Sequence, residues 1–471
     1  MSCGKLCLHL VQAFHSHLRS RSVICVTGQD TSHFIQGLVT NDVSKAIQSI
    51  QRIPGGIGAY SSITDPKTGI SSASSLLASF PLTSLEFAAV LNHRGRVVSD
   101  TMLHFTGEEE CYIEVDKQMT SQMLKLLSLY KLRSKVQIQD VSKDIKVWVS
   151  TMKVIPKNEQ FISNETSNTE SSAITDVNGT NTKDPTHGHV AAVSLASAQL
   201  PIIPIAEALE PFHGFDVLCA NMDPRSAHLG VRVLTKIKHR TESEQDQGLK
   251  DLKREEHVSE SGNDEIYRTN LHVSETVYRG LRILHGVPEG TSGDSSDFAG
   301  NPLPLECNLD VLNGVSFDKG CYVGQELTAR THFTGVIRKR ILPFVIGKSE
   351  QHALELAQYA LTKIGKGTDH ALMHIPEITA NSAPGLSPGV FPRHFLEYDM
   401  SMKPKVNDSI FLLNDANKEN AIGTISSSFY NMGLALFRLE SIFASPESQV
   451  SIPLNLSDGR VCVAWKPRYL S

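Results

Sequence analysis

The alternation of hydrophobic and polar positions predicts strands and helices over most of the first third of the chain. VICVTG, LEFAAVLN, RVVSDTMLHF, CYIEV, VQIQDV and IKVWVS are short apolar runs that end at turn residues, as strands do. The second and third of these would form a hairpin through Gly95. DTSHFIQGL predicts a short helix, and KQMTSQMLKLLSLYKLR has the apolar spacing of a longer one. Strands and helices mixed in this order predict an α+β fold.

Three segments interrupt this pattern. Residues 156–188 are polar and contain one aromatic side chain, so they cannot bury a core and are expected to be disordered. Residues 236–265 are dense in mixed charge, which predicts a second, loosely packed insert with a solvated and partly helical face. Residues 346–403 are expected to be a third insert, with a short amphipathic helix and a Pro/Gly-rich stretch.

The tail of the chain returns to strand patterns. DSIFLLN, AIGTISSSF, GLALFRLE and VCVAWK are short apolar runs separated by turn residues, which predicts a small β-barrel or sandwich. We therefore divide the chain into an α/β core, residues 23–330, that contains the first two inserts, and a C-terminal barrel domain, residues 331–471, that contains the third. A length of 471 residues fits two or three domains.

Residues 1–22 differ in composition from the rest of the chain. They contain basic but no acidic side chains, and apolar residues recur every four positions, which predicts a helix with one apolar face: Leu6, Leu10, Phe14 and Leu18. Such a segment is typical of a mitochondrial transit peptide. The alternative is an ordinary N-terminal segment of a cytosolic protein. A secretory signal would need a continuous apolar run, which His9 and Gln12 interrupt.

Composition narrows the functional classes. The formal net charge of −5 argues against a broad nucleic-acid-binding surface. No stretch approaches 18 uninterrupted apolar residues, so no membrane span is predicted. The eight cysteines are sparse and include no CxxC pair, which argues against a disulfide framework or a zinc finger and favours a reducing compartment.

One cysteine has an unusual neighbourhood. Within DKGCYVGQELTARTHFTG, residues 318–335, Cys321 lies between the end of a predicted strand and the start of a predicted helix. The helix N-terminus and Lys319 would favour a thiolate, the form that binds metals or attacks carbon. Gly320 and Gly324 would permit positive φ angles or the close approach of a ligand.

The residues alone leave three interpretations of Cys321 open: a catalytic nucleophile, a metal ligand or an ordinary buried thiol. A nucleophile needs a nearby base, and His332 would lie at the far end of the same helix. A mononuclear metal site needs more ligands than one cysteine, whereas a cluster shared between two proteins needs fewer from each chain.

This stretch resembles the K-G-C-Y-x-G-Q-E signature of the YgfZ-like proteins, in the superfamily of the glycine-cleavage T-protein, a folate-dependent aminomethyltransferase. Its members here are Lys319, Gly320, Cys321, Tyr322, Gly324, Gln325 and Glu326. Further segments resemble the superfamily in the same order and cover most of the chain outside the leader and the inserts: FIQGLVTND, LNHRGRVVSD, MDPRSAHLGVRVL, YRGLRILHGVPEG, PLECNLDVLNGVSFDKG and GLALFRLE.

The resemblance implies interlaced α/β subdomains plus a C-terminal β-barrel, in a ring around a folate-sized cavity. The Lys-Gly-Cys-Tyr element is missing from the aminomethyltransferase branch, so the chain is more similar to the family's mitochondrial iron–sulfur cluster assembly factors. Such a factor would act in the mitochondrial matrix in [4Fe–4S] protein maturation, with A-type ISCA scaffold proteins as partners. Cys321 would then bind a transient iron–sulfur cluster shared with the scaffold, next to Lys319.

Two other functions remain open. One is a tetrahydrofolate-dependent aminomethyl transferase, which would make the chain an enzyme rather than an assembly factor. The other is a folate-binding or structural protein in which Cys321 only packs. Gln325 and Glu326 belong to the signature but, as residues of the first helical turn, would equally well cap backbone N–H groups.

The resemblance also suggests five residues for tetrahydrofolate binding. Asp100 aligns with the carboxylate that lies close to folate in the transferase branch; alternatively it is an ordinary Asp at a strand end. Asn41 and Asp42 would line the cavity or cap the preceding helix. Tyr278 and Arg282, four residues apart on one predicted helix face, would line the cavity or belong to the core and to a structural ion pair.

Overall fold

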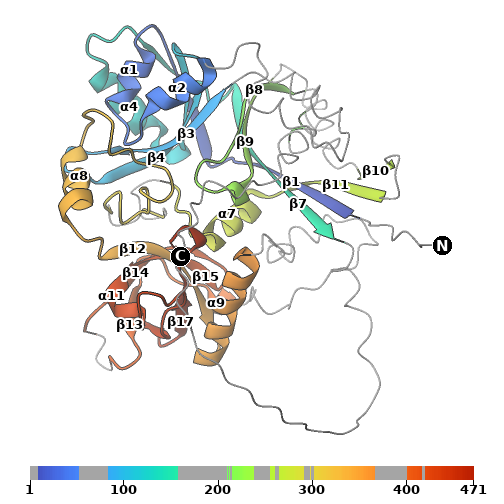
Figure 1. Ribbon diagram of the computed structural model, residues 1–471, viewed down its shortest axis with the longest axis vertical. Helices are drawn as coiled ribbons and strands as arrows, with labels where there is room; N and C mark the ends of the chain where they lie inside the picture. The colour runs from blue at the N-terminus through green and yellow to red at the C-terminus, as the bar shows by residue number, and fades with distance from the viewer. Residues whose placement is uncertain are drawn as a thin grey trace, which may run out of the picture.

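The structure of the protein is a computed structural model. It describes residues 9–51, 83–156, 215–237, 255–259, 265–290, 302–365, 400–415 and 419–470, together with residues 209, 212, 297 and 298. These residues form two open sheets with helices and one closed barrel, which confirms the predicted α+β class with a C-terminal β-barrel (Figure 1).

The first sheet has five antiparallel strands in the order β3-β4-β5-β2-β6. Its elements are β2 (Arg21–Thr27), β3 (Ser84–Leu91), β4 (Val97–Phe105), β5 (Glu110–Asp116) and β6 (Gln137–Asp140), with helices α1 (Thr31–Gln36), α2 (Val43–Gln51) and α4 (Thr120–Lys131). Apolar residues of one sheet face and of all three helices share one buried cluster, so the helices cover that face. The strands and helices predicted in this region are confirmed.

The second sheet has the order β10-β11-β1-β7-β9-β8. Its strands are β1 (His9–His17), β7 (Ile145–Pro156), β8 (Asp216–Met222), β9 (Val231–Lys236), β10 (Glu255–Ser259) and β11 (Glu265–Val273). Strand β1 is parallel to β11 and antiparallel to β7. Helix α7 (Glu275–Leu284) follows β11 and contributes apolar side chains to the cluster shared with β7 and the barrel.

Six strands close the C-terminal barrel in the order β12-β15-β14-β13-β16-β17. They are β12 (Lys339–Gly347), β13 (Ser409–Leu412), β14 (Gly423–Phe429), β15 (Met432–Arg438), β16 (Leu454–Leu456) and β17 (Val461–Ala464). Helix α8 (Gln325–Thr334) lies at the left edge of Figure 1 and leads from the α/β part into β12. Shorter or peripheral elements are α9 (Glu350–Gly365), α11 (Leu439–Ile442) and the 3₁₀ turns η1 (Lys117–Met119), η5 (Ala227–Leu229), η7 (Met400–Met402) and η8 (Arg468–Leu470).

The helix predicted over residues 6–18 is wrong, because residues 9–17 form the internal strand β1. A spacing of four residues fits a helix face, but four is also a multiple of the two-residue period of a strand. Leu18 and Arg21 are buried, so a leader that ended at residue 22 would take away part of the folded protein. Residues 1–8 lie outside the described residues.

Two of the predicted inserts contain ordered structure. Residues 255–259, within the predicted second insert, pair with β11 as an edge strand, and its charged residues are acceptable there because one side has no neighbouring strand. Helix α9 of the third insert is present as predicted, but Ala353, Leu356 and Ala357 are buried in the largest apolar cluster. Residues 157–188 of the first insert lie outside the described residues, and the domain boundary at 330/331 stays a prediction.

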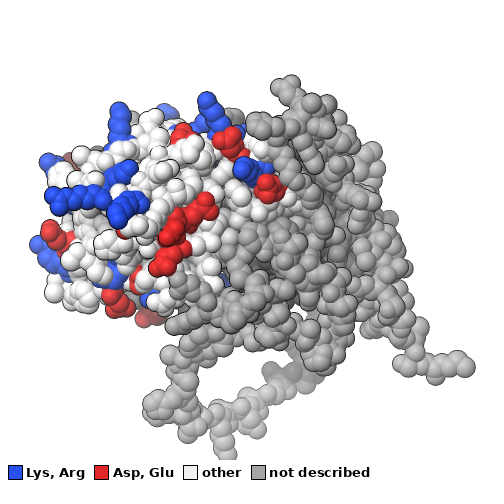
Figure 2. Space-filling model, turned by 90° about the horizontal axis from the view of Figure 1, so that it is seen from above, with Lys and Arg blue, Asp and Glu red and all other residues white. Residues whose placement is uncertain are grey.

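The surface in Figure 2 is mixed in charge. On the described part of that face, Lys and Arg side chains are interspersed with Asp and Glu side chains. This mixture fits the formal net charge of −5. Among the described helices, none has the length and the apolar composition that crossing a membrane requires.

Candidate functional site

The family signature lies in a loop and the first turn of a helix. Residues 315–324, here called the signature loop, lead into α8 without forming a strand, so the strand predicted just before Cys321 is wrong. The helix prediction is confirmed: α8 begins at Gln325, and Gly335 is its C-cap. Cys321 therefore precedes the first helical residue by four positions.

Lys319 fixes the signature loop to the segment between α1 and α2. Its ammonium donates three hydrogen bonds of 2.7 Å, to the carbonyl oxygens of Gln36, Val39 and Asn41. The Tyr322 ring lies 4.9 Å from the same nitrogen, a cation–π contact. Burial lowers the pKa of Lys319 to about 8, although Asp42 opposes the shift. The donors of Lys319 are thus directed at backbone carbonyls, and a role for its charge in holding a thiolate stays a prediction.

Backbone hydrogen bonds continue this connection on both sides of Lys319. The Val323 N–H donates to the Gly37 carbonyl at 3.2 Å, and the Ser316 N–H donates to the Thr40 carbonyl at 3.0 Å. The Thr40 hydroxyl donates to the Gly314 carbonyl at 2.5 Å. The FIQGLVTND segment and the signature, nearly 300 residues apart in sequence, therefore form one structural unit.

Gly324 is required by its backbone. Its φ is +80°, in the left-handed region, and a Cβ there would lie 2.4 Å from the Asn92 carbonyl oxygen. Gly320 differs, since a Cβ on it would meet nothing within 4 Å. The signature thus combines one glycine that the fold demands with one that has open space around it.

Cys321 is exposed, and it is the only exposed cysteine among those that the structure describes. The other described thiols are buried or half-buried, and burial raises the pKa of the Cys111, Cys219, Cys307 and Cys462 thiols. The described residues contain no group of three or more His, Cys, Asp or Glu side chains able to hold a metal ion. An exposed thiol contributes little packing energy, so a purely structural role does not account for Cys321.

The remaining signature residues support the loop. The Gln325 side-chain oxygen accepts a hydrogen bond of 2.9 Å from the Tyr322 N–H, so Gln325 closes the loop onto the helix start. Glu326 is exposed in the first turn of α8, where a negative charge interacts favourably with the helix dipole. Burial raises the pKa of Tyr322 to about 12, which keeps the phenol neutral.

Asn41 and Asp42 lie beside the signature loop rather than next to Asp100. Asp42 accepts from the Ser44 N–H at 3.0 Å at the start of α2, so it caps the following helix and not the preceding one. The Asn41 amide donates to the Phe87 and Asn313 carbonyls at 2.9 and 2.8 Å and to Glu86.

A polar pocket of about 410 Å³ opens between these residues and the loop. Its lining is Asn41, Lys45, Glu86, Asn313, Val315, Ser316, Phe317, Asp318 and His332. Burial, helped by Asp42, raises the pKa of Glu86 to about 7. The pocket therefore contains a carboxyl group that titrates near neutral pH.

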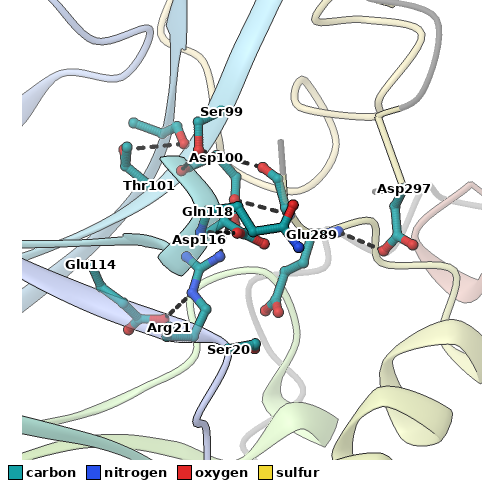
Figure 3. Close-up of polar contacts among 12 residues, drawn as sticks. Ser20, Arg21, Ser99, Asp100, Thr101, Glu114, Asp116, Gln118, Glu289 and Asp297 are labelled. Carbon is teal, nitrogen blue, oxygen red and sulfur yellow. Dashed lines mark hydrogen bonds and ion pairs between the residues drawn. The ribbon is translucent and has the colours of Figure 1, made fainter. Parts of the chain in front are cut away.

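Asp100 occupies a different place, in a cluster of buried charges between the two open sheets (Figure 3). One of its oxygens accepts from the Arg21 guanidinium at 3.1 Å and from the Gly290 N–H at 3.0 Å. The other oxygen, Oδ2, is buried without a hydrogen-bond partner. Burial raises the pKa of Asp100 against the opposing effect of Arg21, which favours the neutral carboxylic acid.

Arg21 connects Asp100 to Glu114. The Arg21 Nε donates to Glu114 at 2.7 Å, and Glu114 also contacts His104 at 3.3 Å and Arg232 at 3.7 Å. Burial alone would raise the pKa of Glu114, but Arg232 and Arg21 lower it to about 2, so it is ionised. His104, fully buried, has a lowered pKa and is neutral.

Tyr278 and Arg282 share one face of α7, as predicted, and both take part in this charged cluster. The Tyr278 hydroxyl donates to Glu289 at 2.6 Å. Arg282 donates to Asp297 and to the Val287 carbonyl. Three arginines hold the pKa of Glu289 well below its usual range despite its burial: Arg225, Arg282 and Arg232.

Four members of the cluster were missed by sequence reasoning: Arg21, Glu114, Arg232 and Glu289. Glu114 and Arg232 each interrupt an apolar strand, in CYIEV and GVRVL, and an isolated charge in such a strand is a usable signal. Arg21 and Glu289 give no such signal, because both lie at the ends of their segments.

Comparison with known proteins gives a consistent name among the relatives. No protein-family model matches the chain. The chain is 30% identical over 361 residues to the "Iron-sulfur cluster assembly factor IBA57 homolog, mitochondrial" of Aspergillus oryzae, covering 74% of this chain and 60% of that protein. A protein of the same name from Dictyostelium discoideum is 26% identical over 448 residues, covering 90% of this chain and 86% of its own length.

The chain thus spans less than two thirds of the length of the Aspergillus relatives, 60% and 56% for A. oryzae and A. fumigatus. Among solved structures, the glycine cleavage system aminomethyltransferase T from Bartonella henselae matches with a TM-score of 0.47 and 8% identity, covering 98% of this chain and 86% of that one.

Proposed function

The chain is a homologue of the curated mitochondrial iron–sulfur cluster assembly factors, and we propose that it has their function. It acts in the mitochondrial matrix in the maturation of [4Fe–4S] proteins. The observation that carries the proposal is the exposure of Cys321 on a loop whose neighbouring residues are used to hold it in place. The relatives' printed names support the process and the compartment.

The finer proposal is that Cys321 supplies one thiolate to a cluster shared with an A-type ISCA scaffold protein. A lone exposed thiol leaves the other ligand positions of a cluster to be filled by a second molecule, because the described residues offer no complete ligand group beside it. The iron–sulfur cluster is then cargo that passes through the complex. The chain acts as an assembly factor, and no described side chain is assigned a catalytic step.

Anaerobic reconstitution of the chain with a cluster-loaded A-type scaffold tests this proposal. The wild type should give a visible circular dichroism spectrum that differs from that of the scaffold alone. Cys321→Ser should lose this spectrum while keeping the melting temperature of the wild type. Cys25→Ser, which changes a half-buried thiol on β2, is the matched control and should keep it. A normal shared spectrum with Cys321→Ser would contradict the proposal.

We also propose that the charged cluster around Asp100 binds tetrahydrofolate without using it chemically. Four buried polar atoms of this cluster lack a hydrogen-bond partner, which suits a polar ligand: Arg21 Nη2, Asp100 Oδ2, Arg225 Nη1 and Arg232 Nη1. A pterin offers both donors and acceptors to such groups. Binding is favoured over aminomethyl transfer because the other Asp100 oxygen is engaged by Arg21 and by the Gly290 N–H.

Thermal unfolding with and without tetrahydrofolate tests this second proposal. At 100 times its Kd the ligand should add about 2.7 kcal/mol of stability. Asp100→Asn should reduce that gain, and Cys321→Ser should not. If tetrahydrofolate fails to raise the melting temperature of the wild type, the folate proposal falls and the cluster proposal is unaffected.

A further inference from the structure

Helix α8 and the segment after it expose an apolar surface that the fold does not use. We propose that residues 331–338, here called the α8 surface, dock an acidic segment of the cluster scaffold that carries an apolar anchor side chain. This inference rests on the proposed function, because it places the partner that shares a cluster with Cys321. It concerns different residues and has a separate test.

The first observation is the exposure of large apolar side chains. Phe333 is 70% exposed and Val336 72% exposed, although they lie only three residues apart. Phe333 belongs to a surface group of rings: Phe317 stacks on His332 with centroids 3.5 Å apart, and His332 contacts Phe333 at 4.9 Å. Adjacent exposed aromatic and apolar side chains are typical of protein interfaces.

The second observation is a groove beside these residues. A cavity of about 250 Å³ lies between α8, residues 303–306 and the start of β12. Leu303, Pro304, Leu327, Val336 and Ile337 give it an apolar lining. This cavity is below the roughly 300–1,000 Å³ of sites for small-molecule ligands, and a single inserted side chain is the usual anchor of a protein interface.

Charge indicates the chemistry of the occupant. Four arginines are exposed on and around α8, namely Arg94, Arg96, Arg330 and Arg338, against two exposed acids, Asp318 and Glu326. The hairpin that carries Arg94 and Arg96 reaches this surface, because Gly95 packs against Gly324 and Leu327. The local excess is positive although the chain has a formal net charge of −5. An acidic partner segment therefore complements it.

The thiol and the groove are close enough for one partner. The ten residues of α8 span about 15 Å, with Cys321 before its N-terminus and Val336 just after its C-terminus. A standard interface buries about 800 Å² on each partner, which is wide enough to cover both ends of such a helix. A protein docked on the α8 surface could present its own cluster ligands to Cys321.

Binding of the cluster-free A-type scaffold, measured by calorimetry, tests the inference. Val336→Asp and Arg338→Glu should each weaken binding at least tenfold without lowering the melting temperature. Leu129→Asp changes a side chain that is 71% exposed on α4 and is the matched control, which should bind as the wild type does. Wild-type binding should weaken as sodium chloride is raised, because the complementarity is electrostatic.

The outcomes separate this inference from the proposed function. Cys321→Ser should still bind the cluster-free scaffold and lose only the shared cluster. If Val336→Asp and Arg338→Glu bind normally while Cys321→Ser loses the cluster, the docking inference is overturned and the proposed function stands. If light scattering shows a wild-type dimer that Val336→Asp converts to monomer, the surface joins two copies of this chain and the inference is overturned.

Discussion

Gly95 and Gly324 meet backbone to backbone. A Cβ on Gly95 would lie 2.9 Å from the Gly324 carbonyl oxygen, and a Cβ on Gly324 would lie 3.2 Å from the Gly95 Cα. Both residues have positive φ, +72° and +80°. This contact joins the β3–β4 hairpin to the start of α8, so two separate sequence segments of the family resemblance are the two sides of one packing contact.

Gly324→Ala should therefore destabilise the protein markedly. The substitution adds left-handed strain of about 1–2 kcal/mol and forces the Asn92 carbonyl away, so a loss of at least about 2 kcal/mol is expected in urea unfolding. Gly320→Ala is the matched control from the same loop and should leave stability unchanged, because a Cβ there has open space. Equal stability of the two variants would show that the close approach at Gly324 is relaxed in solution.

Lys319→Met should destabilise the fold through the carbonyls that it leaves unpaired. The change removes three hydrogen bonds of 2.7 Å and keeps most of the apolar stem. Each unsatisfied buried group costs about 1–3 kcal/mol, although water would reach part of this half-buried site. We expect the free energy of unfolding to fall by about 2–4 kcal/mol. The alkylation rate of Cys321 in the same variant tests the separate prediction that the lysine charge favours the thiolate.

The sequence predicted most of the fold because its strands and helices carry their own periodicity. The β3–β4 hairpin, α4, α8 and the barrel strands needed only local patterns. Residues 9–17 could not be placed in this way, because the partners of β1 are β7 and β11, more than 130 residues away. An apolar spacing of four residues fits both structures, and only these distant partners decide between them.

The candidate site was predictable only in part for the same reason. Cys321 could be singled out because its whole neighbourhood is contiguous in sequence. The charged cluster could not, since Arg21, Asp100, Glu114, Arg232 and Glu289 come from five segments and meet only in the folded protein. Sequence reasoning gave Asp100 a role but could not show that Arg21 is its partner.

Arg21→Met should be far more damaging than Asp100→Asn. Removing Arg21 deprives the ionised and fully buried Glu114 of its 2.7 Å partner, and breaking such a pair typically costs about 3–5 kcal/mol. Asp100→Asn should cost about 1 kcal/mol or less, because the raised pKa of Asp100 already favours a neutral group and an amide oxygen can accept the same two hydrogen bonds. Urea unfolding at pH 7 measures both, and a larger loss for Asp100→Asn would mean that Asp100 is ionised.

Glu86 should make stability depend on pH near neutrality. Its pKa is raised from an ordinary 4.5 to about 7 in the folded protein, so between these values the folded state binds more protons than the unfolded state. The free energy of unfolding should therefore fall as pH rises from 4.5 to 7 and then level off, with a contribution of at most about 3 kcal/mol. Glu86→Gln keeps an oxygen that can accept from the Asn41 amide but cannot titrate. Melting temperatures from about pH 5 to about pH 8 should thus decline less steeply for the variant, which should be the more stable protein at the upper end of that range. Parallel pH profiles for variant and wild type would contradict the assignment of this titration to Glu86.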